Sequence, residues 1–284
     1  MTTGIPKGRT MAGLGRRLVG FTSAGGAMAV ALIMALSPAA AAAGHTYHAP
    51  YAGAVSQTYS STSQSGCATG ALTAPVNWSS TTGVLTMAAK ASAKSCGVQL
   101  AGVGGNSYGS AYGQAEVAIP IKAATSALHT ITVNWKLHAV ASTTFVPGTC
   151  TISTTTTFFQ YCETGAGVSV YGFAYLVDLT NGTYFYPSNY WSFYNESYNE
   201  TYCYSGTCYN SSGSFGYGSL GNVSWFINGT LNKLDSYAIV TYMEGSAYAF
   251  AEAYTATLTG GSGSASISMA GGPNKATLSS IVVT

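Results

Sequence analysis

Apolar and polar side chains alternate with a period of two along most of this chain. The clearest case is 127–140, where Ile131, Val133 and Trp135 share one face and Asn134 lies on the other. This alternation is typical of a β-strand with one buried face. It predicts further strands at 82–93, 112–121, 151–161, 168–179, 237–244, 247–259 and 276–283.

Turn residues separate these segments, and no stretch shows a convincing helical periodicity. Asn181-Gly182, inside 177–185, predicts a hairpin, and Gly-Gly-Pro-Asn at 271–274 predicts a turn. Many strands with glycine-rich turns favour an all-β fold, and about 220 residues can form one such domain. We therefore expect a single antiparallel β-sandwich over 67–284, of the jelly-roll or Ig-like type.

Two segments do not fit the alternation. Residues 44–66 are polar and rich in Ser, Tyr and Ala, which predicts a flexible tail or a loosely attached strand. Such a strand could also be donated to a neighbouring subunit. Residues 187–221 are rich in Tyr, Asn and Ser, with a short tandem repeat at 194–201. We expect this second segment to be a long, irregular, glycosylated excursion from the sandwich.

The amino terminus has the order of a secretory signal peptide. Four basic residues precede an apolar run at 18–36, and alanines at 39–43 follow. Cleavage after Ala43 would remove 1–43 and leave a secreted chain. If the run were retained, it would anchor the protein in a membrane. In both cases the remaining chain is expected outside the cell, secreted or attached to the cell surface.

Removal of 1–43 changes the charge. Six lysines, no arginine and eight acidic residues remain, a formal charge of 6 − 8 = −2. Nucleic acid is excluded as a partner, because phosphate binding needs clustered Lys and Arg. Such sparse charge suits acidic surroundings, where carboxylates are protonated and charge pairs contribute little.

Seven N-x-Ser/Thr sequons follow the signal segment, where about three would arise by chance from 12 asparagines. Sequons at turn tips can also be simple hairpin chemistry, but the clustering of six between 181 and 228 favours N-glycosylation. The expected acceptors are Asn77, Asn181, Asn195, Asn199, Asn210, Asn222 and Asn228.

Six cysteines in an exported chain predict three disulfides. Cys203 and Cys208 flank a short Ser-Gly turn and would face each other across a hairpin. Sequential bridges would complete the set, joining Cys67 to Cys96 and Cys150 to Cys162.

A faint internal repeat raises the question of catalysis. Gly-Ser-Ala-Tyr occurs at 109–112 and 245–248, and it places Glu116 and Glu252 at equivalent positions of two strands. If these strands were neighbours, the two carboxyls could share one site of an acid-active secreted hydrolase, with Gln114 beside Glu116. The alternative is that both glutamates are ordinary solvated or hydrogen-bonded residues.

Copper binding is a further alternative. Cleavage after Gly44 would make His45 the first residue, and an amino-terminal histidine with a second histidine can bind copper. His129 or His138 could supply the partner, but they lie on opposite faces of one strand. Otherwise these are tail and surface histidines, and the chain needs no metal or other cofactor.

Tyrosines recur every four residues beside a tryptophan, at Tyr190, Trp191, Tyr194, Tyr198 and Tyr202. They could form a surface for stacking sugars or for self-association, or they could replace charged residues on an exposed surface.

These features together favour a non-enzymatic, secreted glycoprotein with a structural or adhesive role at a cell surface or in an extracellular filament. Its expected partners are its own copies or other surface glycoproteins and glycans. The hydrolase, carbohydrate-binding and copper-binding functions remain as alternatives.

Overall fold

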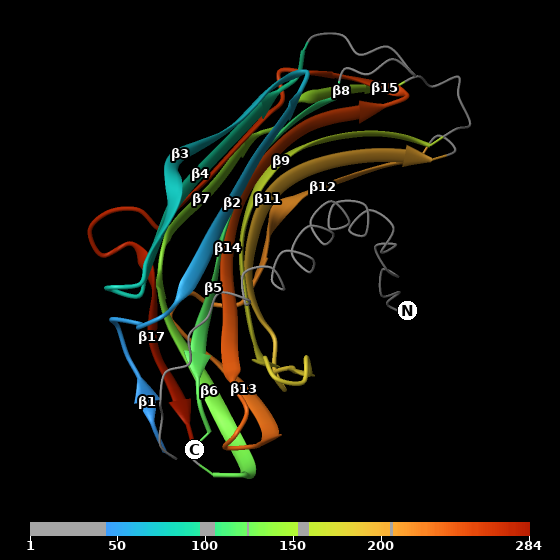
Figure 1. Ribbon diagram of the computed structural model, residues 1–284. Helices are drawn as coiled ribbons and strands as arrows, with labels where there is room; N and C mark the ends of the chain where they lie inside the picture. Colours follow the sequence, from blue (N-terminus) through green and yellow to red (C-terminus); the bar gives the residue numbers. More distant parts are fainter. Residues whose placement is uncertain (1–43, 97–105, 124, 153–158, 205–206) are drawn as a thin grey trace.

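The computed structural model describes residues 44–96, 106–123, 125–152, 159–204 and 207–284, which form an all-β structure of antiparallel sheets (Figure 1). Two large sheets pack face to face as a sandwich, which confirms the predicted fold class. The predicted signal peptide at 1–43 lies outside the described residues.

The eight-stranded sheet has the order β13-β6-β17-β4-β16-β7, with β1 beside β17 and β3 beside β4. Its strands are β1 (Thr46–Tyr47), β3 (Cys67–Ser79), β4 (Val84–Lys94), β6 (Ala127–His138), β7 (Val140–Val146), β13 (Asn222–Leu231), β16 (Ser262–Ser268) and β17 (Lys275–Val283).

The seven-stranded sheet has the order β12-β11-β9-β14-β5-β2, with β10 beside β9. Its strands are β2 (Val55–Ser65), β5 (Ser107–Ile121), β9 (Gln160–Asp178), β10 (Tyr184–Phe185), β11 (Trp191–Tyr204), β12 (Thr207–Tyr217) and β14 (Tyr237–Tyr254). A separate pair joins β8 (Thr149–Ile152) to β15 (Ala256–Thr259).

The core lies between the facing sheets and consists of the residues that the alternation placed on one side of each strand. In β6, Ile131, Val133 and Trp135 are buried, whereas Lys136, which follows them on the other face, is exposed. Side chains on successive strand residues point to opposite faces, so one apolar row fills the core and the polar row faces outward. The strand predicted at 127–140 is thus confirmed, ending at His138.

The three predicted disulfides are all present. Cys203 and Cys208 are directly paired across β11 and β12, with 4.1 Å between their Cα atoms. The other two bridges join Cys67 to Cys96 and Cys150 to Cys162. The first of these ties the start of β3 to the end of β4, and the second ties β8 to β9.

The predicted tail at 44–66 is ordered and belongs to the sandwich. β1 pairs with β17, and β2 pairs with β5 over 11 residues. β2 lies at the edge of a sheet of its own chain, so this segment is an attached edge strand and not a flexible tail. Most residues of β2 are exposed or half-buried, which explains why no apolar row marked it as a strand.

The segment at 187–221 is also regular, contrary to the prediction of an irregular excursion. It forms β11 and β12, which pair over 11 residues. Nearly every residue of β11 is half-buried, because both faces of this strand are partly covered. Tyrosine and glutamate occupy one face, and Asn, Ser and Thr occupy much of the other. Because neither face carries a row of apolar residues, the sequence of this segment shows no alternation of apolar and polar positions.

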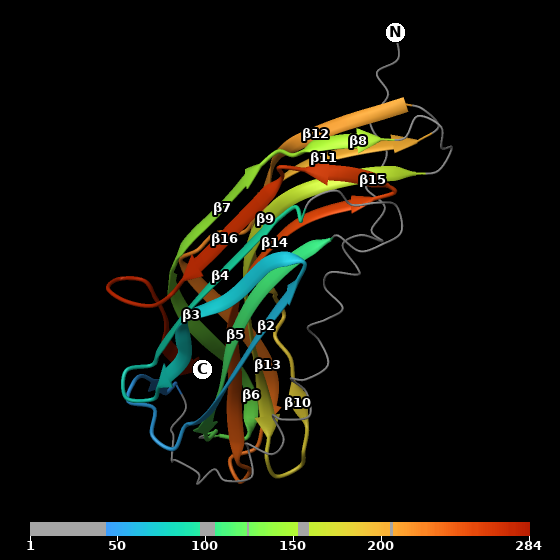
Figure 2. The same ribbon diagram turned by 90° about the horizontal axis from the view of Figure 1, so that it is seen from above.

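Both sheets curve. Figures 1 and 2 show β9, β11 and β14 bending along their length, with the eight-stranded sheet on the outside of the bend. We call the outer side of the seven-stranded sheet the concave face, and the outer side of the eight-stranded sheet the convex face.

Candidate functional site

The concave face is set by the register of five paired strands. In β14 the odd-numbered Met243, Ala247 and Ala249 lie in the core, so the even-numbered residues between Tyr242 and Tyr254 point the other way. Directly paired residues of an antiparallel sheet lie on the same side. Following the pairs through β5, β9, β11 and β12 shows that this face carries mainly Tyr, Phe and Glu.

Charge is segregated between the two sheets. All six glutamates project on the concave face: Glu116, Glu163, Glu196, Glu200, Glu244 and Glu252. Four exposed lysines lie on strands of the eight-stranded sheet: Lys90, Lys94, Lys136 and Lys275. The remaining two, Lys122 and Lys233, lie in connections between strands. Within the part of the chain that the structure describes, the strands of the concave face therefore carry acidic side chains and no basic ones.

Aromatic rings pack in pairs across neighbouring strands of this face. Tyr161 stacks on Tyr254 with ring centroids 5.9 Å apart, and Tyr202 stacks on Tyr209 at 5.1 Å. Stacked pairs of this kind hold each ring in place while leaving one ring face or edge available. Tyr190 is 75 % exposed although it stacks on a ring of the same face. The rings thus form a fixed, wettable platform.

The predicted tyrosine cluster is assembled only in part. Tyr194, Tyr198 and Tyr202 share the concave face, because a spacing of four residues keeps the same side of a strand. Trp191 is turned the other way and packs against the core. Tyr190 precedes β11 and stacks on Phe173 of β9 with their centroids 5.8 Å apart.

A hydrogen-bonded centre lies near the middle of the concave face. Glu244 of β14 and Gln114 of β5 are directly paired, and both are partly exposed. The buried Tyr112 hydroxyl bonds to the side-chain oxygen of Gln114, and it lies 3.0 Å from Oε2 of Glu244. Burial raises the pKa of Glu244 from 4.5 to about 7, although the bond from Tyr112 acts in the opposite direction.

Tyr112 connects the two side chains of this centre. Its hydroxyl has one proton to donate, and both Oε2 of Glu244 and the side-chain oxygen of Gln114 lie within reach as acceptors. Burial favours the neutral form of Glu244, whereas the bond donated by Tyr112 favours the ionised form, and burial is the larger of the two effects.

A second buried carboxyl lies beside this centre. Glu116 is 4 % exposed, and burial raises its pKa while a hydrogen bond from Gln57 lowers it. Its Oε1 has no hydrogen-bond partner within the part of the chain that the structure describes. Glu116 is paired with Tyr242, two residues from Glu244, so the two carboxyls occupy diagonal positions of adjacent strands.

The predicted pairing of Glu116 with Glu252 is wrong. The two repeats lie on adjacent antiparallel strands, in which Gly113 is paired with Gly245. Because the two chains run in opposite directions from this pair, equivalent positions further along the repeats move apart. Glu116 faces Tyr242, ten residues from Glu252 and about 33 Å away along the strand. Glu252 is instead level with Glu163, which in turn pairs with Glu200. The sequence did not identify Glu244, because its pairing with Gln114 depends on the register of β5 and β14.

None of the seven sequons lies on the concave face. Asn222 and Asn228 of β13 are exposed and alternate with buried core residues, which places them on the convex face. Asn77, Asn181 and Asn210 are also exposed, on β3, in the turn after β9 and on β12. The half-buried Asn195 and Asn199 lie on the opposite side of β11 from its tyrosines and glutamates.

The three candidate copper-binding histidines lie on or beside two strands: His45 precedes β1, and His129 and His138 belong to β6. His129 is buried, and its two ring nitrogens each lie 3.1 Å from a backbone oxygen, of Thr284 and of Thr125. Both nitrogens are thus occupied. His45 packs its ring on Tyr47, and His138 pairs with Lys275. Among the described residues, no group of three or more His, Cys, Asp and Glu could hold a metal ion.

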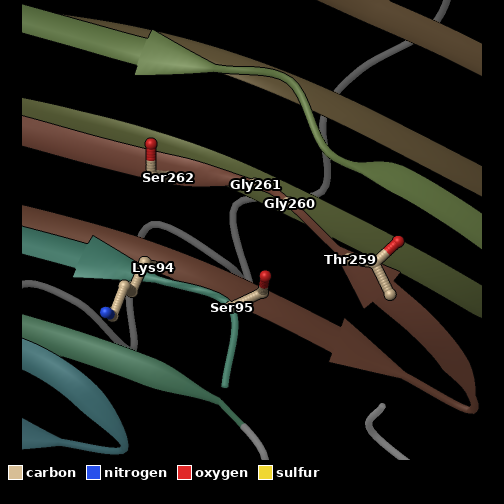
Figure 3. Close-up of a pocket in the computed structure, with 6 residues that line it drawn as sticks. All are labelled: Lys94, Ser95, Thr259, Gly260, Gly261 and Ser262. Atoms are coloured by element: carbon tan, nitrogen blue, oxygen red, sulfur yellow. The ribbon is translucent and has the colours of Figure 1, made fainter. Parts of the chain in front are cut away.

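A hollow of about 430 Å³ lies at one end of the sandwich, away from this centre (Figure 3). It is lined by Lys94, Ser95, Thr259, Gly260, Gly261 and Ser262. Lys94 is its one charged lining residue, so the hollow offers no set of groups that could act together.

The described residues contain no helix with the length and hydrophobicity of a membrane span.

No protein-family model matches this chain, and no curated protein is similar to it.

Proposed function

We propose that this protein is an extracellular adhesive protein whose concave face binds neutral saccharide chains of surface glycoproteins or of a cell surface. The observation that carries the proposal is that one curved face gathers paired aromatic rings and all six glutamates, and contains no sequon. Glycans on the other faces would leave this one free to bind.

The chemistry of the face suits a saccharide. The apolar C–H side of a sugar ring packs on an aromatic ring, and Tyr190, Tyr186 and Tyr217 are all more than half exposed. Carboxyl and amide groups beside the rings can hydrogen-bond sugar hydroxyls. The face carries no lysine, so polyanionic chains would meet only like charge. A neutral chain therefore fits best.

The remaining features are consistent with this role. Three disulfides suit an oxidising compartment, and the order of residues in 1–43 favours export. A chain with so few charges would stay soluble through the Ser, Thr and Asn side chains of the convex face and through the expected N-glycans there.

Binding can be tested with the secreted chain on an array of neutral and acidic polysaccharides, followed by titration calorimetry. We expect binding to neutral chains and a roughly tenfold loss of affinity in Tyr190→Ala, since a stacked ring contributes about 1 kcal/mol or more. Phe226→Ala is the matched control, because Phe226 is an exposed ring on the convex face. Binding to acidic chains alone, or equal losses in the two variants, would contradict the proposal.

A further inference from the structure

The strand β12 forms one edge of the seven-stranded sheet, and its outer side is not paired within the described part of the chain (Figure 2). It packs against β11 and makes no comparable contact with another described strand. We propose that this edge pairs with the same edge of a second copy of the chain, in a two-fold symmetric dimer whose two seven-stranded sheets become one. This pairing does not depend on saccharide binding.

β12 lacks the features that normally keep a sheet edge from pairing. Soluble proteins protect such edges with charged side chains, proline, a bulge or a very short strand. β12 is 11 residues long and contains no charged residue and no proline. Its register with β11 is unbroken from Thr207 to Tyr217, so no bulge twists the edge away. The edge is therefore a long, regular template for another strand.

The edge of the other sheet at β13 is covered, in contrast. The backbone N–H of Ser188 donates to the backbone oxygen of Phe226 at 2.9 Å. The side chain of Asn189 accepts from the N–H of Phe226 at 3.1 Å and donates to the backbone oxygen of Ser224 at 2.7 Å. At the far edge of the seven-stranded sheet, β2 packs against β3. Among the described residues, β12 has no cover of this kind.

The Cys203–Cys208 pair shows which backbone groups of β12 point outward. Its Cα atoms are 4.1 Å apart, the short separation of a pair that exchanges no backbone hydrogen bonds. Such pairs alternate with hydrogen-bonded ones along an unbroken antiparallel register. Every second residue from Cys208 onward therefore turns its N–H and C=O away from β11. These residues are Cys208, Asn210, Ser212, Ser214 and Gly216.

The outward residues are arranged symmetrically about Ser212. A two-fold axis beside Ser212 places it opposite Ser212 of the partner subunit. Asn210 then pairs with Ser214 of the partner subunit, and Cys208 pairs with Gly216 of the partner subunit. Each such pair exchanges two backbone bonds, which gives about ten across the axis. That number is typical of a protein interface, and no charged side chain of β12 meets its own copy.

The same register continues the aromatic platform across the axis. Tyr209 and Phe215 are 52 % and 49 % exposed, and both lie on the concave face. The two-fold arrangement places Tyr209 directly opposite Phe215 of the partner subunit, and cross-strand aromatic pairs of this kind stabilise a sheet. The side chain of Asn210, an expected glycan acceptor, projects from the opposite face, perpendicular to the edge. A glycan there would leave the backbone of the edge open.

The test measures the mass of the full secreted chain, with its disulfides intact, by sedimentation equilibrium over a range of concentrations. We expect a dimer that dissociates on dilution. Ser212→Lys should weaken the dimer at least about tenfold, because two like charges would stand directly opposite each other at the axis. Ser63→Lys makes the same change at an exposed position of β2, the other edge strand of this sheet, and should leave the dimer unchanged.

Ser212→Pro tests the backbone contact without adding charge. Proline is tolerated at an edge position whose N–H faces solvent, so the chain should fold. It removes the N–H groups that form the central bonds of the dimer, and we expect a monomer at concentrations where the parent chain is a dimer. Melting curves of the two Ser212 variants establish that each is folded.

Hydrogen exchange of the parent chain locates the contact. In the dimer the amides of Ser212 and Ser214 should be protected, and dilution to the monomer should speed their exchange. The amides of Ser211 and Gly213 face β11 and should change little. A parent chain that stays monomeric at high concentration, or a dimer that persists in both Ser212 variants, would overturn the proposal. Assemblies lost in Ser63→Lys but kept in Ser212→Lys would place the contact at β2 and overturn it as well.

Discussion

Trp135 and Thr241 are joined across the core of the sandwich. The indole Nε1 of Trp135, in the eight-stranded sheet, donates to Oγ1 of Thr241 in the seven-stranded sheet at 3.0 Å. The Thr241 hydroxyl in turn donates to the backbone oxygen of Phe173 at 3.1 Å. Both residues are fully buried. One hydroxyl therefore satisfies the indole N–H and links the two layers through a polar contact.

Thr241→Val should destabilise the fold by about 1–3 kcal/mol. Valine keeps the volume but removes the acceptor, which leaves the Trp135 N–H buried without a partner. Urea unfolding of the secreted chain measures the loss. Thr62→Val, at an exposed position of β2, is the control and should change stability by less than about 0.5 kcal/mol. Equal stability of the parent chain and Thr241→Val would show that the contact contributes nothing.

Gly263→Ala should destabilise the protein by about 3 kcal/mol or more. Gly263 of β16 lies where the two sheets approach closely, and an added Cβ would overlap the backbone oxygen of Gly165 in β9. Backbone of a paired strand cannot move aside cheaply. Gly213→Ala is the control, since open space surrounds that glycine. Similar melting temperatures for the two variants would contradict this account of the sheet contact.

Removing the Cys203–Cys208 bridge should loosen only the edge of the seven-stranded sheet. The bridge closes a short hairpin, for which chain entropy gives about 2 kcal/mol. β12 pairs with β11 alone, so it can open without disturbing β9 and β14. In Cys203→Ser/Cys208→Ser we expect faster hydrogen exchange in β12 and unchanged exchange in β14. Faster exchange throughout both sheets would instead assign the bridge a global role.

The sequence was sufficient for the parts of the fold in which one face of a strand is apolar. Ile131, Val133 and Trp135 predicted β6 correctly, because burial of one face leaves a row of apolar residues. The Cys203–Cys208 pair was predictable for a local reason, because these two cysteines flank a short turn. β2, β11 and β12 were missed because neither of their faces is apolar.

The candidate site was predictable only as a set of residue types. The alternation placed Gln114 and Glu116 on one face, and the structure retains that. Which carboxyl lies near them depends on the pairing of β5 with β14, and the repeat suggested Glu252. Antiparallel register brings Glu244 there instead. Register is a property of the whole sheet, set by packing and turns, and a single strand does not contain it.

Stability should rise as the pH falls from 8 to about 4, and Glu244→Gln should flatten this dependence. The folded-state pKa of Glu244 is about 7, raised by burial above the ordinary 4.5. The contribution of this carboxyl is complete below the unfolded pKa and is lost as the pH rises through 7, by up to about 3 kcal/mol. Burial also raises the pKa of Glu116, which acts in the same direction. Urea unfolding at pH 4, 6 and 8 measures the slope. A parent chain that is less stable at pH 4 than at pH 8 would contradict both the sign and the expectation that this surface suits acidic surroundings.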